Sequence, residues 1–224
     1  MAMKMARAAS RKKTLPFAFS AKHVEYIRRC AANQINVAEG AVRAGKTVDN
    51  VFAFAHELKT TPDKIHLATG STAANAKLNI GDAIKGPDTG YRTRIVIFAG
   101  GALASSFKKI RGNSYGMWIA TEINLHHDNT IKEAFNRQLA AKRRKIFWDL
   151  NPDHPHAPIY TDYIDKYSTQ QQEGKLLGGY NYEHFTIWDN ATVSEQRRRE
   201  IISQYDPHSI WYRRDIEGKR CAAE

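Results

Sequence analysis

Eight consecutive residues, Gly40-Ala41-Val42-Arg43-Ala44-Gly45-Lys46-Thr47, match the phosphate-binding pattern G-x-x-x-x-G-K-[ST] in full. In such a loop the glycines let the backbone curl, so that successive N–H groups point at phosphate oxygens. Lys46 is expected to reach the β- and γ-phosphates of a nucleotide, and the Thr47 hydroxyl is expected to hold Mg²⁺. These residues therefore predict a site for a nucleoside triphosphate such as ATP, together with Mg²⁺.

The residues around the loop have the pattern of the strand and helix that a P-loop joins. Residues 34–38 form a short alternating segment that ends at the loop. After the loop, apolar residues recur at helical spacing, at Val48, Val51, Phe52, Ala55 and Leu58. A helix that begins at the loop directs the positive end of its dipole to the phosphates. This context argues against the alternative, a glycine-rich turn that binds nothing.

An acidic residue follows a second apolar segment. Residues 116–120 predict a buried strand, and Thr121 and Glu122 come directly after it. In P-loop ATPases an acidic pair at this position orders the Mg²⁺ shell with its first acid and polarises the attacking water with its second. Glu122 is therefore the candidate catalytic residue, whereas Thr121 would contact a Mg²⁺-bound water only weakly. The alternative is an ordinary acid at the end of a strand.

Two more polar residues could act on a γ-phosphate. Arg43, inside the loop, is expected either to stabilise charge on the transferring phosphoryl group or to bridge to a neighbouring acid and hold the shape of the loop. Asn151 follows the predicted strand 145–150 and precedes Pro152. It could sense the γ-phosphate and couple its presence to movement. A strand-terminating Asn-Pro turn is the commoner explanation for such a residue.

The composition points to a polyanionic partner. The chain has 224 residues, a net charge of +11 and a pI of about 9.6. Basic residues concentrate in segments 1–29, 91–115 and 132–145, which suits nucleic acid, although a solubilising surface explains any single segment equally well. Two distant cysteines fit a reducing compartment and provide no disulfide or metal framework. No apolar run is long enough for a membrane span, and the basic N-terminus lacks the apolar region of a secretory signal.

The remaining pattern predicts alternating strands and helices. A helix capped by Ser20 is expected through residue 32, with Val24, Ile27 and Ala31 on one face, and another capped by Ser194 through residue 205. Further helices are predicted at 72–80 and 131–139, strands at 64–69, 94–98, 116–120, 145–150 and 182–188, a turn at 86–90 and a loop at 168–179. Four aromatic residues in these strands are assigned to the core: Trp118, Phe147, Trp148 and Trp188. The fold class predicted is α/β, with a mostly parallel sheet covered on both faces and ligands at the carboxyl ends of its strands.

The order of these parts resembles the ATPase domain of a bacteriophage terminase large subunit, the motor that packages viral DNA. The resemblance covers roughly residues 17–220. It rests on the P-loop with Arg43, on the apolar strand 116–120 closing on Glu122, on Leu150-Asn151-Pro152 as a coupling motif, and on segments 185–190 and 212–219 near the end. It implies a P-loop NTPase of the ASCE type over residues 17–224, preceded by a basic arm over residues 1–16. The nuclease domain of the family is expected to be absent.

The resemblance also implies partners and residue roles. It implies double-stranded DNA, a portal and a small terminase subunit as partners, a homo-oligomeric ring, and a location in the host cell cytoplasm. His23 stands where family members often have a glutamine that reads adenine, and Thr121 stands where they usually have aspartate. Alternatives from the residues alone are a helicase, a small-molecule kinase, or an assembly module that binds ATP without hydrolysing it.

Overall fold

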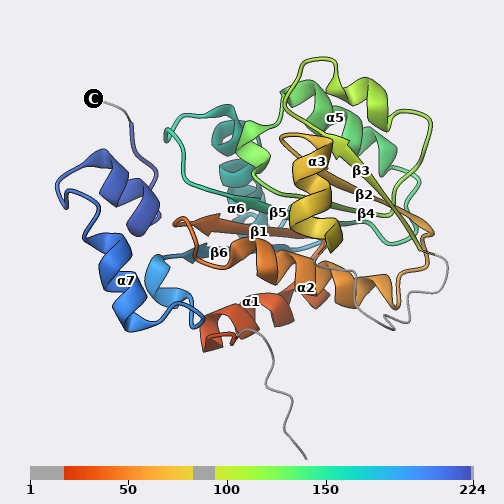
Figure 1. Cartoon of the computed structure of the whole chain (residues 1–224). Helices are drawn as coiled ribbons and strands as arrows, with labels where there is room; N and C mark the ends of the chain where they lie inside the picture. The colour runs from red at the N-terminus through yellow and green to blue at the C-terminus, as the bar shows by residue number, and fades with distance from the viewer. Residues whose placement is uncertain (1–17, 83–93, 223–224) are drawn as a thin grey trace, which may run out of the picture.

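The structure is a computed structural model that describes residues 18–82 and 94–222. The basic arm predicted over residues 1–16 and the turn predicted over residues 86–90 lie outside these ranges. The order of the elements and the two ends of the described chain can be followed in Figure 1.

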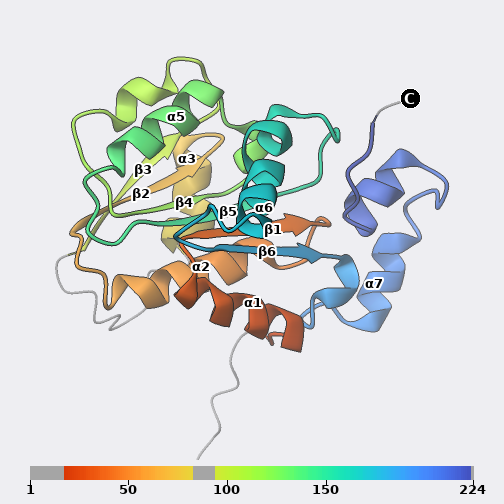
Figure 2. The same ribbon diagram turned by 180° about the vertical axis from the view of Figure 1, so that it is seen from behind.

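Six parallel strands form one sheet in the order β3-β2-β4-β5-β1-β6. Their bounds are Ile35–Gly40 for β1, Ile65–Gly70 for β2, Ile95–Gly100 for β3, Met117–Ala120 for β4, Lys145–Leu150 for β5 and Tyr180–Phe185 for β6. The predicted α/β fold with a parallel sheet is confirmed. Because β5 lies between β1 and β4, the carboxyl ends of all three strands meet at one edge of the sheet. In Figures 1 and 2 the arrows of β1 and β6 point to the side of the molecule where α7 lies.

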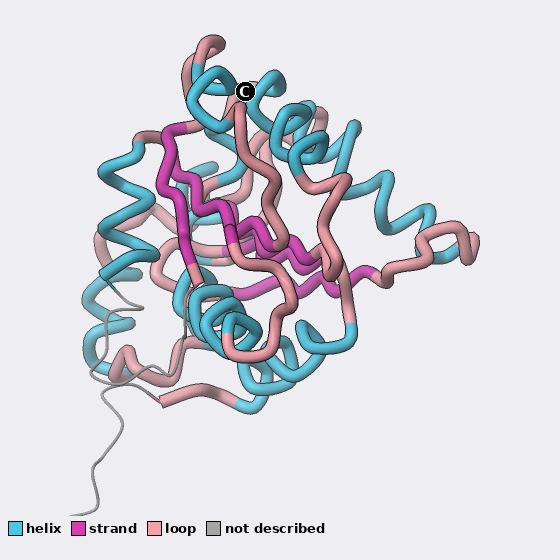
Figure 3. The backbone as a smooth tube through the Cα atoms, turned by 90° about the vertical axis from the view of Figure 1, so that its right-hand side faces the viewer, coloured by secondary structure: helices cyan, strands magenta, loops and turns pink. Residues whose placement is uncertain are grey.

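Helices cover both faces of the sheet, so that the strands form the middle layer in Figure 3. On one face, α1 (Ala21–Ala32) packs against α2 (Lys46–Leu58), and α2 contacts β1, β4 and β5. On the other face lie α5 (Asp128–Arg137), the π-helix η4 (Ile159–Ile164) and α6 (Asp165–Gln172). The other helical elements of the described residues are α3 (Ala73–Ala76), η1 (Lys77–Gly81), η2 (Ser106–Ile110), η3 (Ile123–Leu125), η5 (Ile187–Asp189), α7 (Glu195–Ile202) and η6 (Tyr212–Ile216).

The period of two along β5 divides its side chains between the two cores. Ile146 and Trp148 pack with residues of α5 and η4, and Trp148 meets Trp118 edge-to-face with ring centroids 5.3 Å apart. Phe147 points to the opposite face, where it contacts Phe54 of α2. The core positions predicted for Trp118, Phe147 and Trp148 are confirmed, since all three are fully buried.

The buried faces of the first two helices differ from the predicted ones. The side chains that α1 buries are His23, Tyr26 and Cys30, one residue out of step with the predicted face, and Val24 is half exposed. In α2, Val48 and Phe52 are exposed, while Phe54 and the polar Asn50 are buried. The two helices meet through a polar contact, because the Tyr26 hydroxyl donates to Oδ1 of Asn50 over 2.7 Å. The caps were predicted correctly, since Ser20 and Ser194 each accept a backbone N–H.

Two predictions in the last third of the chain were right only in part, because their bounds differ from the observed ones. The stretch predicted as a loop over 168–179 begins inside a helix, because α6 extends to Gln172. Tyr163 and Tyr167 supply the inward face of this region by packing against Trp148. The strand predicted over 182–188 covers Tyr180–Phe185 instead. Trp188 therefore lies in the turn η5, where it is 46% exposed rather than in the core.

Two buried histidines make the stability of the fold sensitive to acid. His66 is fully buried, and its Nδ1 accepts the N–H of Met117 over 3.1 Å. Burial lowers the pKa of His66 to about 4, and burial also lowers the pKa of His126 to about 4. Unfolded histidine takes up a proton near pH 6.5. Between about pH 6.5 and pH 4 the unfolded chain therefore binds protons that the folded chain does not bind.

We expect the free energy of unfolding to be insensitive to His66 above about pH 6.5 and to fall as the pH drops from there towards 4. From pH 6.5 to 5 the loss from this residue is about 1.5 kcal/mol. His66→Asn keeps an acceptor near the Met117 N–H and cannot titrate, so it should reduce the difference between pH 7 and pH 5 in urea unfolding. The same change at the exposed His56 should leave that difference unaltered. Equal pH dependence in wild type and His66→Asn would contradict the expectation.

Candidate nucleotide-binding site

Backbone contacts from the last strand and from the C-terminal region hold the P-loop between β1 and α2. The N–H of Ala41 donates to the carbonyl of Phe185 over 2.8 Å, and the N–H of Val42 donates to that of Asp215 over 3.0 Å. Gly40 has a φ of +147°, and a Cβ there would lie 1.8 Å from the carbonyl oxygen of Phe185. Only glycine fits this position. The helix α2 begins at Lys46, as predicted from the motif.

Lys46 points back into its own loop. Its Nζ donates to the carbonyls of Gly40 over 2.8 Å and of Ala41 over 2.5 Å, and to Oδ1 of Asn151 over 3.0 Å. The side chain is buried, and burial lowers the pKa of Lys46 to about 8, although nearby carboxylates, that of Asp149 first, oppose this shift. Asn151, predicted from the chain order alone, thus contacts the lysine of the loop directly.

Two non-glycine residues of the described chain have a positive φ, and both border this site. Arg43 has a φ of 59° and Glu122 a φ of 53°, in the left-handed region that costs a residue with a Cβ about 1–2 kcal/mol. The N–H of Glu122 donates to Oδ1 of Asp149 over 3.1 Å, and its carbonyl accepts the N–H of Leu125 over 2.9 Å. Strain of this kind persists only where its surroundings enforce it, and such residues gather at functional sites.

The shape of the loop does not depend on an ion pair of Arg43. The side chain of Arg43 is exposed and forms no ion pair with a described residue. Instead, Nδ2 of Asn190 donates to the carbonyl of Arg43 over 2.6 Å. The second role considered for Arg43, an ion pair that holds the shape of the loop, is therefore not seen among the described residues. The guanidinium remains available to a ligand.

Asp149 is a site residue that the sequence analysis missed. It is 3% exposed, and its Oδ1 accepts both the N–H of Glu122 and the hydroxyl of Thr121, the latter over 3.3 Å. Burial raises the pKa of Asp149 to about 6, while the N–H of Glu122, the charge of Lys46 and the hydroxyls of Thr47 and Thr121 oppose that shift. The sequence did contain a signal for Asp149, because it is an acidic residue inside the mostly apolar segment 145–150.

His23 lies beside the loop but is already paired on one nitrogen. Its Nδ1 is hydrogen-bonded to the carboxylate of Asp49, and its ring stacks on Phe185 with centroids 4.4 Å apart. The other nitrogen, Nε2, is buried without a hydrogen-bond partner in the described part of the chain. The ring lines a small pocket with Phe19, Gly45, Val48 and Asn190 among others. A base edge could use the free nitrogen, so the role given to His23 stays a prediction.

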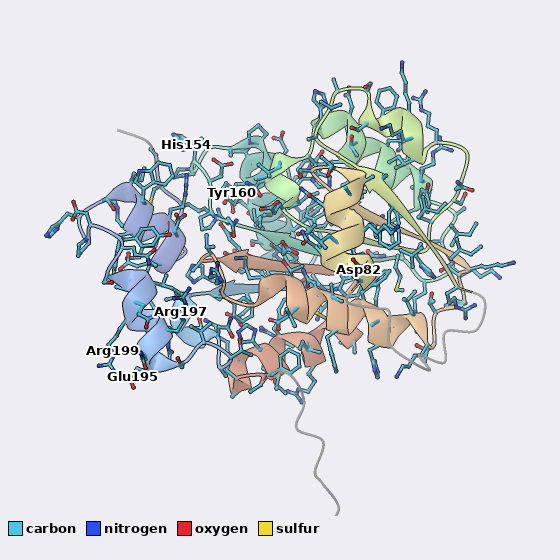
Figure 4. All side chains as sticks on the ribbon, viewed as in Figure 1. Asp82, His154, Tyr160, Glu195, Arg197 and Arg199 are labelled. Carbon is cyan, nitrogen blue, oxygen red and sulfur yellow. The ribbon has the colours of Figure 1, made fainter. Side chains whose placement is uncertain are left out.

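Arg43, Lys46, Glu122, Asp149 and Asn151 line one open cleft of about 680 Å³, within the range for small-molecule sites. The P-loop from Val42 to Val48 forms one wall, and the carboxyl ends of β4 and β5 contribute Thr121, Glu122, Asp149 and Asn151. Arg197 of α7, labelled in Figure 4, also lines the cleft and was not predicted. The structure thus brings together the residues predicted from the loop, the acid and the coupling motif. A second hollow, between α5 and residues 161–166, shares no lining residue with this cleft.

Ion pairs within the fold occupy much of the basic segment 132–145. Lys132 pairs with Asp128 over 2.6 Å, and Arg137 with Glu133 over 2.8 Å. Arg143 pairs with Glu57 over 2.9 Å, and the buried Lys145 lies 3.5 Å from the same carboxylate. Much of the charge in this segment is therefore neutralised by neighbouring acids. No helix in the part of the chain that the structure describes is long and apolar enough to cross a membrane.

The sheet is parallel, β5 lies between the P-loop strand β1 and the strand β4, and the P-loop leads into α2. Together these features define a P-loop NTPase fold. Three solved structures of the large terminase from a thermophilic bacteriophage share it. One matches with a TM-score of 0.73 at 20% sequence identity, and it covers 90% of this chain and 53% of that chain. The complex of that protein with ADP gives 0.72 at 18% identity, and the complex with ATP-gamma-S gives 0.70 at 20%, with the same coverage.

The predicted resemblance to terminase large subunits is confirmed at the level of the fold. The chain corresponds to about half the length of those terminase chains. No protein-family model matches the sequence, and neither does any curated protein.

The strained backbone of Glu122 gives a test of the site geometry that needs no ligand. Glu122→Gly and Glu122→Ala both remove the carboxylate, but only alanine keeps a Cβ in the left-handed conformation. We expect the glycine variant to be more stable than the alanine variant by about 1 kcal/mol. At the exposed Lys132 inside α5 the order should reverse by a similar amount. Chemical unfolding of the four variants measures this, and a less stable glycine variant at position 122 would refute the conformation.

Proposed function

We propose that this chain is the ATP-hydrolysing part of a viral DNA-packaging motor of the terminase large-subunit type. The observation that carries the proposal is the convergence of Lys46, Glu122 and Asn151 on one cleft in a fold shared with a large terminase. The terminase used in the comparison has been solved with ADP and with ATP-gamma-S, so its fold accommodates such nucleotides.

Each residue has a role in ATP hydrolysis that follows from its chemistry. The backbone N–H groups of the loop and Lys46 bind the phosphates, and the Thr47 hydroxyl offers a hard oxygen ligand to Mg²⁺. Mg²⁺, when bound, neutralises developing charge on the β- and γ-phosphate oxygens. Glu122 accepts a proton from, or orients, the attacking water. Arg43 lines the cleft and its side chain is exposed, so its guanidinium can reach a ligand there. Its role is to stabilise charge on the transferring phosphoryl group.

Asn151 links the nucleotide to the rest of the domain. Its Oδ1 accepts a hydrogen bond from Lys46, so a γ-phosphate that attracts the ammonium group competes directly with Asn151. Loss of that bond frees the segment after β5, which is the kind of two-state element that couples hydrolysis to movement. The base of the nucleotide is assigned to the pocket beside His23.

The assembled motor would translocate double-stranded DNA into a procapsid. Its partners would be DNA, a portal, a small terminase subunit and further copies of this chain in a ring, in the host cell cytoplasm. The net charge of +11 supports a DNA partner. Turnover that depends on neighbouring copies would make activity rise with protein concentration.

We expect the wild-type chain to hydrolyse ATP with Mg²⁺ and to be stimulated by duplex DNA. Glu122→Gln should lower kcat by about 10²–10⁴-fold and retain ATP binding, because it removes only the group that acts on water. Lys46→Ala should lose ATP binding, because it removes the phosphate ligand. The matched change Glu173→Gln, on an exposed side chain away from the cleft, should alter neither. Steady-state hydrolysis and calorimetric ATP binding, over a protein concentration series, measure these effects.

Turnover unchanged in Glu122→Gln would remove Glu122 from the mechanism. Stimulation by single strands rather than duplex would favour a helicase. Tight binding without hydrolysis under every condition would favour the assembly module.

A further inference from the structure

We propose that Asp149, on β5, supplies the carboxylate that orders Mg²⁺ in this cleft, in place of the acid that is missing at Thr121, directly after β4. This inference rests on the proposed function, because it concerns the metal of the same nucleotide site. Mg²⁺ in nucleotide sites is usually held through one or two carboxylates, substrate phosphates and waters. With a threonine at the expected position, such a carboxylate would come from another residue.

The strand geometry directs Asp149 and Thr121 to the same point. On β4 and β5, Ile119 and Phe147 belong to the core on the α2 side of the sheet. Side chains two residues further along each strand point to that same face, which brings Thr121 and Asp149 to the side where α2 begins. The two strands pair in parallel with Ala120 opposite Trp148, so Thr121 and Asp149 are cross-strand neighbours. Their hydrogen bond over 3.3 Å agrees with this register.

One oxygen of Asp149 is held and the other is free. Oδ1 accepts from the N–H of Glu122 and from the Thr121 hydroxyl. Oδ2 is buried and has no hydrogen-bond partner among the described residues, although the side chain lines the nucleotide cleft. A buried carboxylate oxygen without a partner is costly, and a cation would offset that cost. The hard oxygens of Asp149 and of Thr47, which line the same cleft, suit Mg²⁺.

The neighbouring carboxylates are committed elsewhere. Glu39 is bound by Arg220 over 2.8 Å and by the Tyr182 hydroxyl over 2.7 Å. Asp49 is bonded to His23. Among the residues that line the cleft, the acids are Glu122 and Asp149. Since Glu122 is assigned to the attacking water, Asp149 is left for the metal.

Thr121 then acts as a positioning residue. Its hydroxyl donates to Oδ1 of Asp149 and so fixes the rotation of the carboxylate, while Oδ2 has no hydrogen-bond partner among the described residues. The pair of residues carries one carboxylate and one hydroxyl, on β5 and directly after β4. An exchange of the two side chains keeps both groups and moves the carboxylate by one strand.

The test is the affinity for the non-hydrolysable analogue adenylyl imidodiphosphate, measured by calorimetry with Mg²⁺ and with EDTA. Wild type is expected to bind about tenfold more tightly with Mg²⁺. Asp149→Asn retains an acceptor for the Glu122 N–H, so its affinity in EDTA should stay within about threefold of wild type, while the gain from Mg²⁺ disappears. Asp153→Asn, just beyond the same strand, is the matched control and should keep the gain.

The exchange variant, Thr121→Asp with Asp149→Thr, should recover the gain from Mg²⁺ that Asp149→Thr alone loses. It also serves if Asp149→Asn fails to fold, which circular dichroism would reveal. A folded exchange variant that does not respond to Mg²⁺, or an Asp149→Asn variant that responds as wild type does, would overturn the role of Asp149 and leave the ATPase proposal standing. Failure of the wild type to bind the nucleotide with Mg²⁺ would overturn both.

Discussion

The buried ammonium group of Lys46 is the constraint on which the site depends. A charge taken out of water must be surrounded by oxygens, and here two carbonyls of the loop and the amide oxygen of Asn151 surround it. The carboxylates of Asp149, Glu39 and Glu122 add favourable charge. These partners come from β1, from the segment after β4 and from β5. One lysine therefore interacts with groups at the carboxyl ends of three strands. A phosphate would exchange with these same oxygens, which connects ligand binding to the packing of the sheet edge.

The same edge of the sheet stores backbone strain. Arg43 and Glu122 both adopt the left-handed conformation without being glycines. At Glu122 the carboxylate of Asp149 holds the N–H, and the turn η3 holds the carbonyl. Asp149 therefore has two roles in the fold: its Oδ1 holds the backbone N–H of Glu122, and its buried Oδ2 has no hydrogen-bond partner among the described residues.

The part of the site that is contiguous in sequence was predictable, and the part that depends on two strands was not. The loop from Gly40 to Thr47 is a local pattern, and its strand and helix followed from it. Asp149 lies 28 residues from Thr121 in sequence, and their contact follows only from the register of β4 and β5. The face of α1 was misjudged because His23 is buried by its bond to Asp49, a contact that hydrophobic periodicity does not register. The helix α6 was missed because a single tyrosine among polar residues, Tyr167, supplies its inward contact with Trp148.

The C-terminal region is part of the site, because it holds the strand that enters the loop. Glu39, next to Gly40, is 1% exposed and is paired with Arg220, which also contacts Asp165 over 2.7 Å and lies over the ring of Tyr160. Removing one member of such a buried pair costs about 3–5 kcal/mol, since the other charge is left without a partner. The carbonyl of Asp215 and the close approach of Gly218 to Ala41 add backbone contacts at the loop itself. The phosphate-binding loop is therefore held in place from two directions, by its own strand β1 and by residues 215–220.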